Sequence, residues 1–110
     1  MEGLAKGDIV LIPFPFSDLS SIKNRPCLVV ATLKGEDIIL CQITSQARED
    51  KDAIAITEKD FQKGKLNITS YARPTKIFTA DTTIIISKIG ELQEIKIKEV
   101  ENKLCEIFTR

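Results

Sequence analysis

The chain has 110 residues, which is enough for one domain with one hydrophobic core. Apolar residues make up 43% of the chain, which indicates a folded globule and argues against disorder. Lys and Arg number 16, as do Asp and Glu, so no overall charge attracts nucleic acid. With no apolar run of about 18 residues and no charged-then-apolar leader, we expect a cytoplasmic protein without membrane contact.

The residue types also limit the chemistry. There is no histidine, which excludes histidine-ligated metal sites and a histidine general base. We expect no metal and no cofactor. The three cysteines, Cys27, Cys41 and Cys105, have no CxxC spacing, and their odd number argues against a disulfide framework. We predict all three to be small buried apolar residues.

The first half of the chain reads as three strands. Residues 7–16 begin as an apolar strand and then meet two prolines, so this end must be an edge, a bulge or an exit from the sheet. A polar loop follows at 17–24. Residues 26–33 are apolar on both faces, which is typical of a buried central strand, and 37–44 form its partner.

A turn at residues 34–37 would join the second and third strands as a hairpin. Pairing outward from it sets residues 26–28 opposite about 43–45. Pro26 restricts Arg25 to extended geometry, and Thr44 ends the face that also carries Gln42. We therefore expect Arg25 and Thr44 to be neighbours.

The second half continues in short elements. Residues 53–56 form a short strand, and 57–60 have the cap-like start of a single helical turn. Residues 70–78 form a strand interrupted by a proline. Residues 82–87 are rich in β-branched types, which predicts another strand.

From Gln93 the apolar period changes to three and four residues, which predicts a helix of about four turns. The stripe consists of Ile97, Val100, Leu104 and Ile107. About six strands and one terminal helix without βαβ alternation favour a small, strongly curved antiparallel sheet or barrel packed against the helix.

The balanced charge is unevenly distributed. Residues 20–34 contain three basic and no acidic residues, and residues 59–76 contain five basic residues and one acidic residue. Residues 35–58, between them, contain two basic and six acidic residues. Such segments are often ordinary solvated faces, but two basic segments beside one site would also suit an RNA path.

Four parts of the chain follow one another in a distinctive order: GDIVLIPFPFSDLSSIKNRPCLVV, ILCQITSQ, SYARPTKIFTAD and the closing helix. In this order they resemble the MazF/PemK family of toxin endoribonucleases. The resemblance covers nearly the whole chain, as a single toxin domain at 1–110. It implies an SH3-like antiparallel barrel with a C-terminal helix, usually a homodimer. The family's loop before RP is often rich in glycine, whereas this one has none.

The resemblance also implies an activity, that of an mRNA interferase: metal-independent, sequence-specific cleavage of single-stranded RNA by the ribose 2′-OH. The catalytic candidates are Arg25 and Thr44. Arginine stays protonated and matches phosphate, so we expect Arg25 mainly to stabilise charge. It is also a candidate proton donor, and the division of roles between Arg25 and Thr44 is left open. The RNA-binding candidates are Lys23, Ser45, Gln46 and Lys76.

The implied biological role is that of the toxin in a toxin-antitoxin pair, with a cognate antitoxin that covers Arg25 and any DNA contact made only through that antitoxin. Two other classes share the fold. A CcdB-like toxin would bind a topoisomerase and cleave nothing, and retention of Arg25 and Thr44 favours the nuclease over it. An SH3-like interaction module needs an exposed aromatic groove. This chain has one tyrosine and no tryptophan, which argues against such a module.

Overall fold

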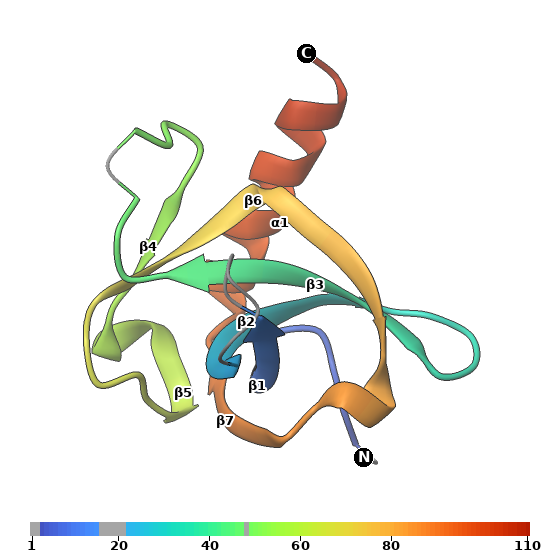
Figure 1. Cartoon of the computed structure of the whole chain (residues 1–110). Coiled ribbons are helices and arrows are strands. Elements are labelled where there is room, and N and C mark those ends of the chain that lie inside the picture. The colour runs from blue at the N-terminus through green and yellow to red at the C-terminus, as the bar shows by residue number, and fades with distance from the viewer. Residues whose placement is uncertain (1–2, 16–21, 48) are drawn as a thin grey trace.

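A computed structural model describes residues 3–15, 22–47 and 49–110 of the chain. It consists of seven strands, two 3₁₀ turns and one α-helix (Figure 1). The strands and the helix are β1 (Asp8–Pro15), β2 (Ile22–Thr32), β3 (Asp37–Thr44), β4 (Ile54–Ile56), β5 (Phe61–Gly64), β6 (Ser70–Asp81), β7 (Ser87–Leu92) and α1 (Glu94–Phe108).

The strands form one antiparallel sheet in the order β4-β6-β3-β2-β1-β7-β5. Its two outermost strands are close in sequence, because a 3₁₀ turn at Glu58–Asp60 joins β4 to β5. This link draws both ends of the sheet together and curls it into a half-barrel (Figure 1). The predicted small, curved antiparallel barrel with a C-terminal helix is confirmed. Within the described residues, no helix is long and apolar enough to cross a membrane.

Alternation along the strands fills two apolar clusters on opposite faces of the sheet. Cys27 and Val29 of β2 belong to one cluster, whereas Leu28 between them belongs to the other. In β3, Leu40 lies in the first cluster and Cys41 in the second. Burial on both faces explains why the central strands are apolar throughout.

The helix covers the Leu28–Cys41 side of the sheet. Val100 is buried there, and Ile97 and Leu104 pack against the same cluster, as the apolar stripe predicts. Lys96, near the start of the helix, donates a 3.0 Å hydrogen bond to the carbonyl oxygen of Ala55 in the edge strand β4. The helix thus contributes apolar packing and also caps part of an unpaired sheet edge.

Three expectations from the sequence are wrong. Residues 82–87 do not form a strand: Asp81 accepts a 2.8 Å bond from the Thr83 amide and caps a 3₁₀ turn at Thr82–Ile84, and β7 begins only at Ser87. The strand β5 after the first 3₁₀ turn was not expected. Cys105 is exposed, because it lies beside the helix's apolar stripe, although Cys27 and Cys41 are buried. Phe16 and most of the 17–24 loop lie outside the described residues.

Gly64 offers a test of the β5–β7 pairing. Its φ is +70°, and a Cβ there would collide with the carbonyl oxygen of Ile89. Gly64→Ala should lower the free energy of unfolding by about 3 kcal/mol or more, measured by urea denaturation. Gly35→Ala is the matched control, because Gly35 has φ +88° with nothing within 4 Å, and should cost only about 1 kcal/mol. Equal losses would contradict the described β5–β7 packing.

The cysteines offer a second test. Burial raises the pKa of both Cys27 and Cys41 to about 12, so each remains a protonated, shielded thiol at pH 8. Native protein should therefore react with one equivalent of a thiol reagent such as Ellman's reagent, at the exposed Cys105, and unfolded protein with three. Rapid reaction of a second thiol under native conditions would contradict the described core, and Cys105→Ser should remove the native reaction.

Candidate nucleic-acid interface

The β2–β3 hairpin brings the two catalytic candidates to one face of the sheet. Its last backbone pair is Cys27 with Gln42, a register two residues from the expected one. Two residues further along each strand are Arg25 and Thr44, so the continued register sets them opposite each other on the face of Gln42. On its other side, Arg25 pairs with Ile12 of β1 and is partly buried.

Thr44 ends β3 with its hydroxyl already engaged. The hydroxyl donates a 3.0 Å hydrogen bond to the carbonyl oxygen of Gln46 and accepts a 3.2 Å bond from the Gln46 amide. These contacts close a tight turn at the start of the 45–53 loop. Thr44 would have to release the Gln46 carbonyl before donating to a phosphate, whereas its remaining lone pair can accept a hydrogen bond directly.

Lys76 lies in a bulge of β6 beside Gln42. Cys41 pairs with Ile77 while its neighbour Gln42 pairs with Arg73, so three residues, 74–76, have no partner in β3. Proline at position 74 lacks an amide hydrogen and cannot donate to the ladder, which favours the bulge there. The strand bends sharply at this point, near the top of Figure 1.

Beside the bulge lies an open cavity of about 340 Å³. It is lined by Phe14, Gln42, Lys76, Ile77 and Phe78. The two phenylalanine rings meet edge to face, with 5.9 Å between their centroids. Lys76 is exposed and has no ion-pair partner among the described residues. The cavity therefore combines an aromatic wall with an available positive charge.

A second cavity, of about 240 Å³, lies at the other side of Thr44. It is lined by Ser45, Gln46, Ala47 and Tyr71. Tyr71 pairs directly with Thr44 across the β3–β6 ladder, so both side chains project from the same face. The sheet thus places Ser45 and Gln46 together at this cavity, and Lys76 at the first.

The loop behind the second cavity is held by an ion pair. The Nε of Arg73 lies 2.7 Å from the Oδ2 of Asp50, whose side chain is only 8% exposed. Asp50 also accepts a 3.0 Å bond from the Asp52 amide through its other oxygen. The Arg73 side chain is thus occupied in supporting the loop.

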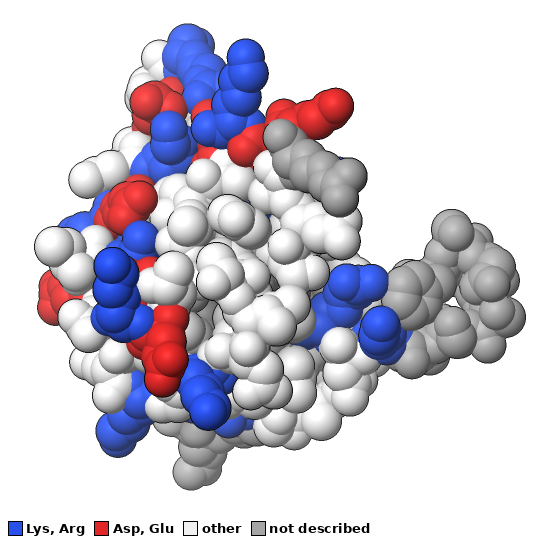
Figure 2. Space-filling model, turned by 90° about the vertical axis from the view of Figure 1, so that its left-hand side faces the viewer, with Lys and Arg blue, Asp and Glu red and all other residues white. Residues whose placement is uncertain are grey.

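Charge is not spread evenly around these cavities. Lys23 is exposed and pairs with Phe14 of β1, so it lies on the side of the first cavity. Figure 2 shows the side of the molecule at which β3 ends. Its middle is mostly uncharged, and Lys and Arg gather at the margins, mixed with Asp and Glu along the top and the left side of the view. The basic candidates and the neutral cavity therefore occupy different parts of one surface.

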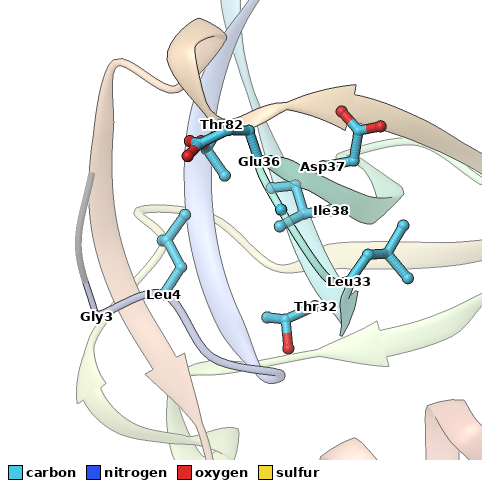
Figure 3. Close-up of a pocket in the computed structure, with 9 residues that line it drawn as sticks. Gly3, Leu4, Thr32, Leu33, Glu36, Asp37, Ile38 and Thr82 are labelled. Atoms are coloured by element: carbon cyan, nitrogen blue, oxygen red, sulfur yellow. The ribbon is translucent and has the colours of Figure 1, made fainter.

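A third cavity, at the opposite end of β3, has unsuitable chemistry for a polyanion. This cavity of about 320 Å³ is lined by Leu4, Leu33, Glu36, Asp37 and Thr82, among others (Figure 3). Thr82 donates a 3.2 Å hydrogen bond to the Glu36 carboxylate, and none of the lining residues is basic. Like-charge repulsion would exclude a phosphate there.

Sequence reasoning missed the aromatic lining of both cavities. Phe14 and Phe78 come from strands that are not neighbours in the sheet, and their contact depends on its curl. Tyr71 was part of a recognised motif, but its position opposite Thr44 depends on the β3–β6 register. A β3–β6 pairing proposed from the sequence would have identified Tyr71.

The curled antiparallel sheet with one terminal helix defines the class of the protein as a small SH3-like barrel. A family model described as the PemK-like, MazF-like toxin of type II toxin-antitoxin systems matches residues 5–108. Because this match spans nearly the whole chain, the protein belongs to that family, and the resemblance seen in the sequence is confirmed. A comparison with curated protein sequences found no match.

Solved structures share the fold at low sequence identity. An endoribonuclease in complex with its cognate antitoxin, from a mycobacterial species, is 14% identical with a TM-score of 0.77, and the match covers 97% of this chain and 96% of that one. A MazE–MazF structure from Deinococcus radiodurans is 16% identical with a TM-score of 0.77 and covers 98% of both chains. A further mycobacterial endoribonuclease is 17% identical, with a TM-score of 0.74, covering 99% and 94%.

The Arg73–Asp50 pair can be tested by a double-mutant cycle. Arg73→Gln and Asp50→Asn should show a coupling free energy of about 1–2 kcal/mol in urea unfolding, because one partner is shielded from water. The control cycle uses Lys6 and Glu101, whose side chains are 47% and 29% exposed. A smaller coupling is expected there, and equal couplings would contradict a special role for the shielded pair.

Proposed function

We propose that this protein is a metal-independent, sequence-specific endoribonuclease that cleaves single-stranded RNA. The observation that carries the proposal is the convergence of Arg25, Thr44 and Lys76 on one sheet face beside an open cavity. Membership of the MazF-like toxin family and the likeness to structures titled endoribonucleases support the same reaction.

The proposed step is attack by a ribose 2′-OH on the adjacent phosphorus. The new O–P bond replaces the bond to the 5′ oxygen of the next nucleotide, giving a cyclic phosphate and a 5′-hydroxyl end. The 2′ oxygen loses a proton, the leaving oxygen gains one, and negative charge builds up on the phosphoryl oxygens in between. The protein must stabilise that charge in a fixed position.

Arg25 is suited to this charge because a guanidinium forms two parallel hydrogen bonds to phosphate oxygens. Thr44 orients the 2′-OH through its free lone pair or donates to the phosphate after releasing Gln46. Lys23 and Lys76 bind the flanking backbone, and Ser45 and Gln46 contact the nucleotide beside the reaction. Single strands are the expected substrate, because bases in an A-form duplex cannot be splayed into these cavities.

The biological role that fits is a growth-inhibiting toxin held inactive by a cognate antitoxin in the cytoplasm. One of the similar structures is titled as an endoribonuclease in complex with its cognate antitoxin, and another as MazE–MazF. An acidic antitoxin segment laid across Lys23, Arg25 and Lys76 would block access to the phosphate site.

Cleavage can be tested on a long unstructured RNA in the presence of EDTA, with the fragment ends mapped. Wild-type protein should cut at a few fixed short sequences. Arg25→Ala should lower kcat/KM about 100- to 1000-fold, because a preorganised donor to the developing charge is lost. Thr44→Ala should lower it about tenfold or more.

The matched control is Arg110→Ala, which removes an arginine that pairs with Asp52 and Glu106 at the end of the helix. It should cleave like wild type. Intact RNA with wild-type protein, or equal cleavage by Arg25→Ala, would contradict the proposed activity and direct attention to protein targets of the CcdB kind.

A further inference from the structure

We propose that the cavity of Ser45, Gln46, Ala47 and Tyr71 holds one unstacked RNA base, with the base stacked on Tyr71 and its edge bound by Gln46. The inference rests on the proposed nuclease function and deepens it, because it assigns the residues that select the cleaved sequence. We call this cavity the Tyr71 cavity.

Its position fits a nucleotide that adjoins the reacting phosphate. Tyr71 pairs directly with Thr44, the residue opposite Arg25 in the continued register. Gln42 lines the first cavity and Ser45 lines the Tyr71 cavity, so the two are separated by roughly 10 Å along β3. A strand whose phosphate meets Arg25 can therefore extend into the Tyr71 cavity.

Its size fits one ring system. The cavity volume of about 240 Å³ lies below the range of roughly 300–1000 Å³ that is typical of drug-sized ligands. Tyr71 is partly buried, so its ring is held by neighbours and still borders the cavity. Stacking of an RNA base on a fixed aromatic side chain is a common way to bind single strands.

Its hydrogen-bonding groups are available. The backbone of Gln46 is occupied by Thr44, but within the described part of the chain its side-chain amide makes no hydrogen bond. The same holds for the hydroxyl groups of Ser45 and Tyr71. A glutamine amide offers one donor and one acceptor side by side, which matches the edge of adenine. The chemistry therefore favours adenine in this cavity.

Its charge indicates a base and not a phosphate. None of the four lining residues is charged, and the nearby Arg73 is neutralised by Asp50. Two exposed lysines, Lys23 and Lys76, lie on the side of the first cavity. The backbone would follow these cations while the base enters the neutral cavity.

The cavity is also preorganised. Thr44 fixes the turn that carries Gln46, and the Arg73–Asp50 pair holds the loop behind it. A cavity fixed before binding holds a base more tightly than one that must order itself, because less entropy is lost on binding.

The chain provides its own probe for base stacking. Tyr71 is the only tyrosine and there is no tryptophan, so intrinsic fluorescence comes from this side chain. A random-sequence pool of 2′-O-methyl RNA binds without offering an attacking 2′-OH. Titration with this pool should quench the fluorescence to saturation, beyond the linear loss that free N-acetyltyrosinamide shows in the same solutions. Absence of this saturable quenching would overturn the inference.

Cleavage-site mapping then tests the selection of the base. Tyr71→Ala should lower kcat/KM about 5- to 150-fold and weaken the base preference at one position beside the cut. Tyr71→Phe keeps the ring and should recover most of that loss. Gln46→Ala should relax the preference at the same position, and Gln46→Glu should shift it from adenine towards cytosine, since a carboxylate only accepts hydrogen bonds. Phe108→Ala, at an exposed aromatic residue on the helix, is the control.

The outcomes separate the two proposals. RNA cleavage by wild type with unchanged rate and preference in Tyr71→Ala would overturn the base cavity and leave the nuclease standing. Saturable quenching without any cleavage would overturn the nuclease and support the cavity as an RNA-binding site.

Discussion

The position of β3 between β2 and β6 is the constraint on which the candidate interface depends. Each residue near the end of β3 has neighbours from two strands that are far apart in sequence. Gln42 lies between Cys27 and Arg73, and Thr44 pairs with Tyr71. Because hydrogen-bonded pairs leave no freedom of register once one face is buried, the cores below also fix the polar groups at the strand ends.

The bulge in β6 adds the second element of the site. Without it, the register of the Cys41–Ile77 pair would continue and Lys76 would pair directly with Gln42 in the ladder. The unpaired residues 74–76 move the strand outward, and the lysine then borders a cavity with Phe14 and Phe78. A local defect in the ladder thus separates a cationic, aromatic cavity from the neutral Tyr71 cavity.

Local patterns made the hairpin predictable, while long-range pairing made the rest of the surface hard to predict. A short turn and the alternation within β3 indicate that Arg25 and Thr44 approach each other. The β2–β3 register predicted in this way differs from the observed one by two residues. Lys76 reaches that face through the β3–β6 pairing, and Tyr71 meets Thr44 only because of the bulge in that pairing, which no local pattern specifies. The strand predicted at residues 82–87 was wrong for a related reason. Their β-branched composition favours a strand, but the Asp81 cap stabilises a 3₁₀ turn instead.

The balanced net charge has a consequence for how this protein would recognise RNA. Affinity for a single strand falls with salt by a slope of about 0.7 per phosphate contact, so contacts by Lys23, Arg25 and Lys76 would give a slope of only about 2. Strongly basic RNA-binding proteins gain most of their affinity from such contacts and discriminate little between sequences. With so few phosphate contacts, an RNA complex of the proposed kind would have to obtain much of its affinity from bases, and affinity obtained from bases depends on sequence. If the Tyr71 cavity holds a base as proposed, a neutral chain with a few cations beside it would be better suited to cutting at selected sites than to general degradation of RNA.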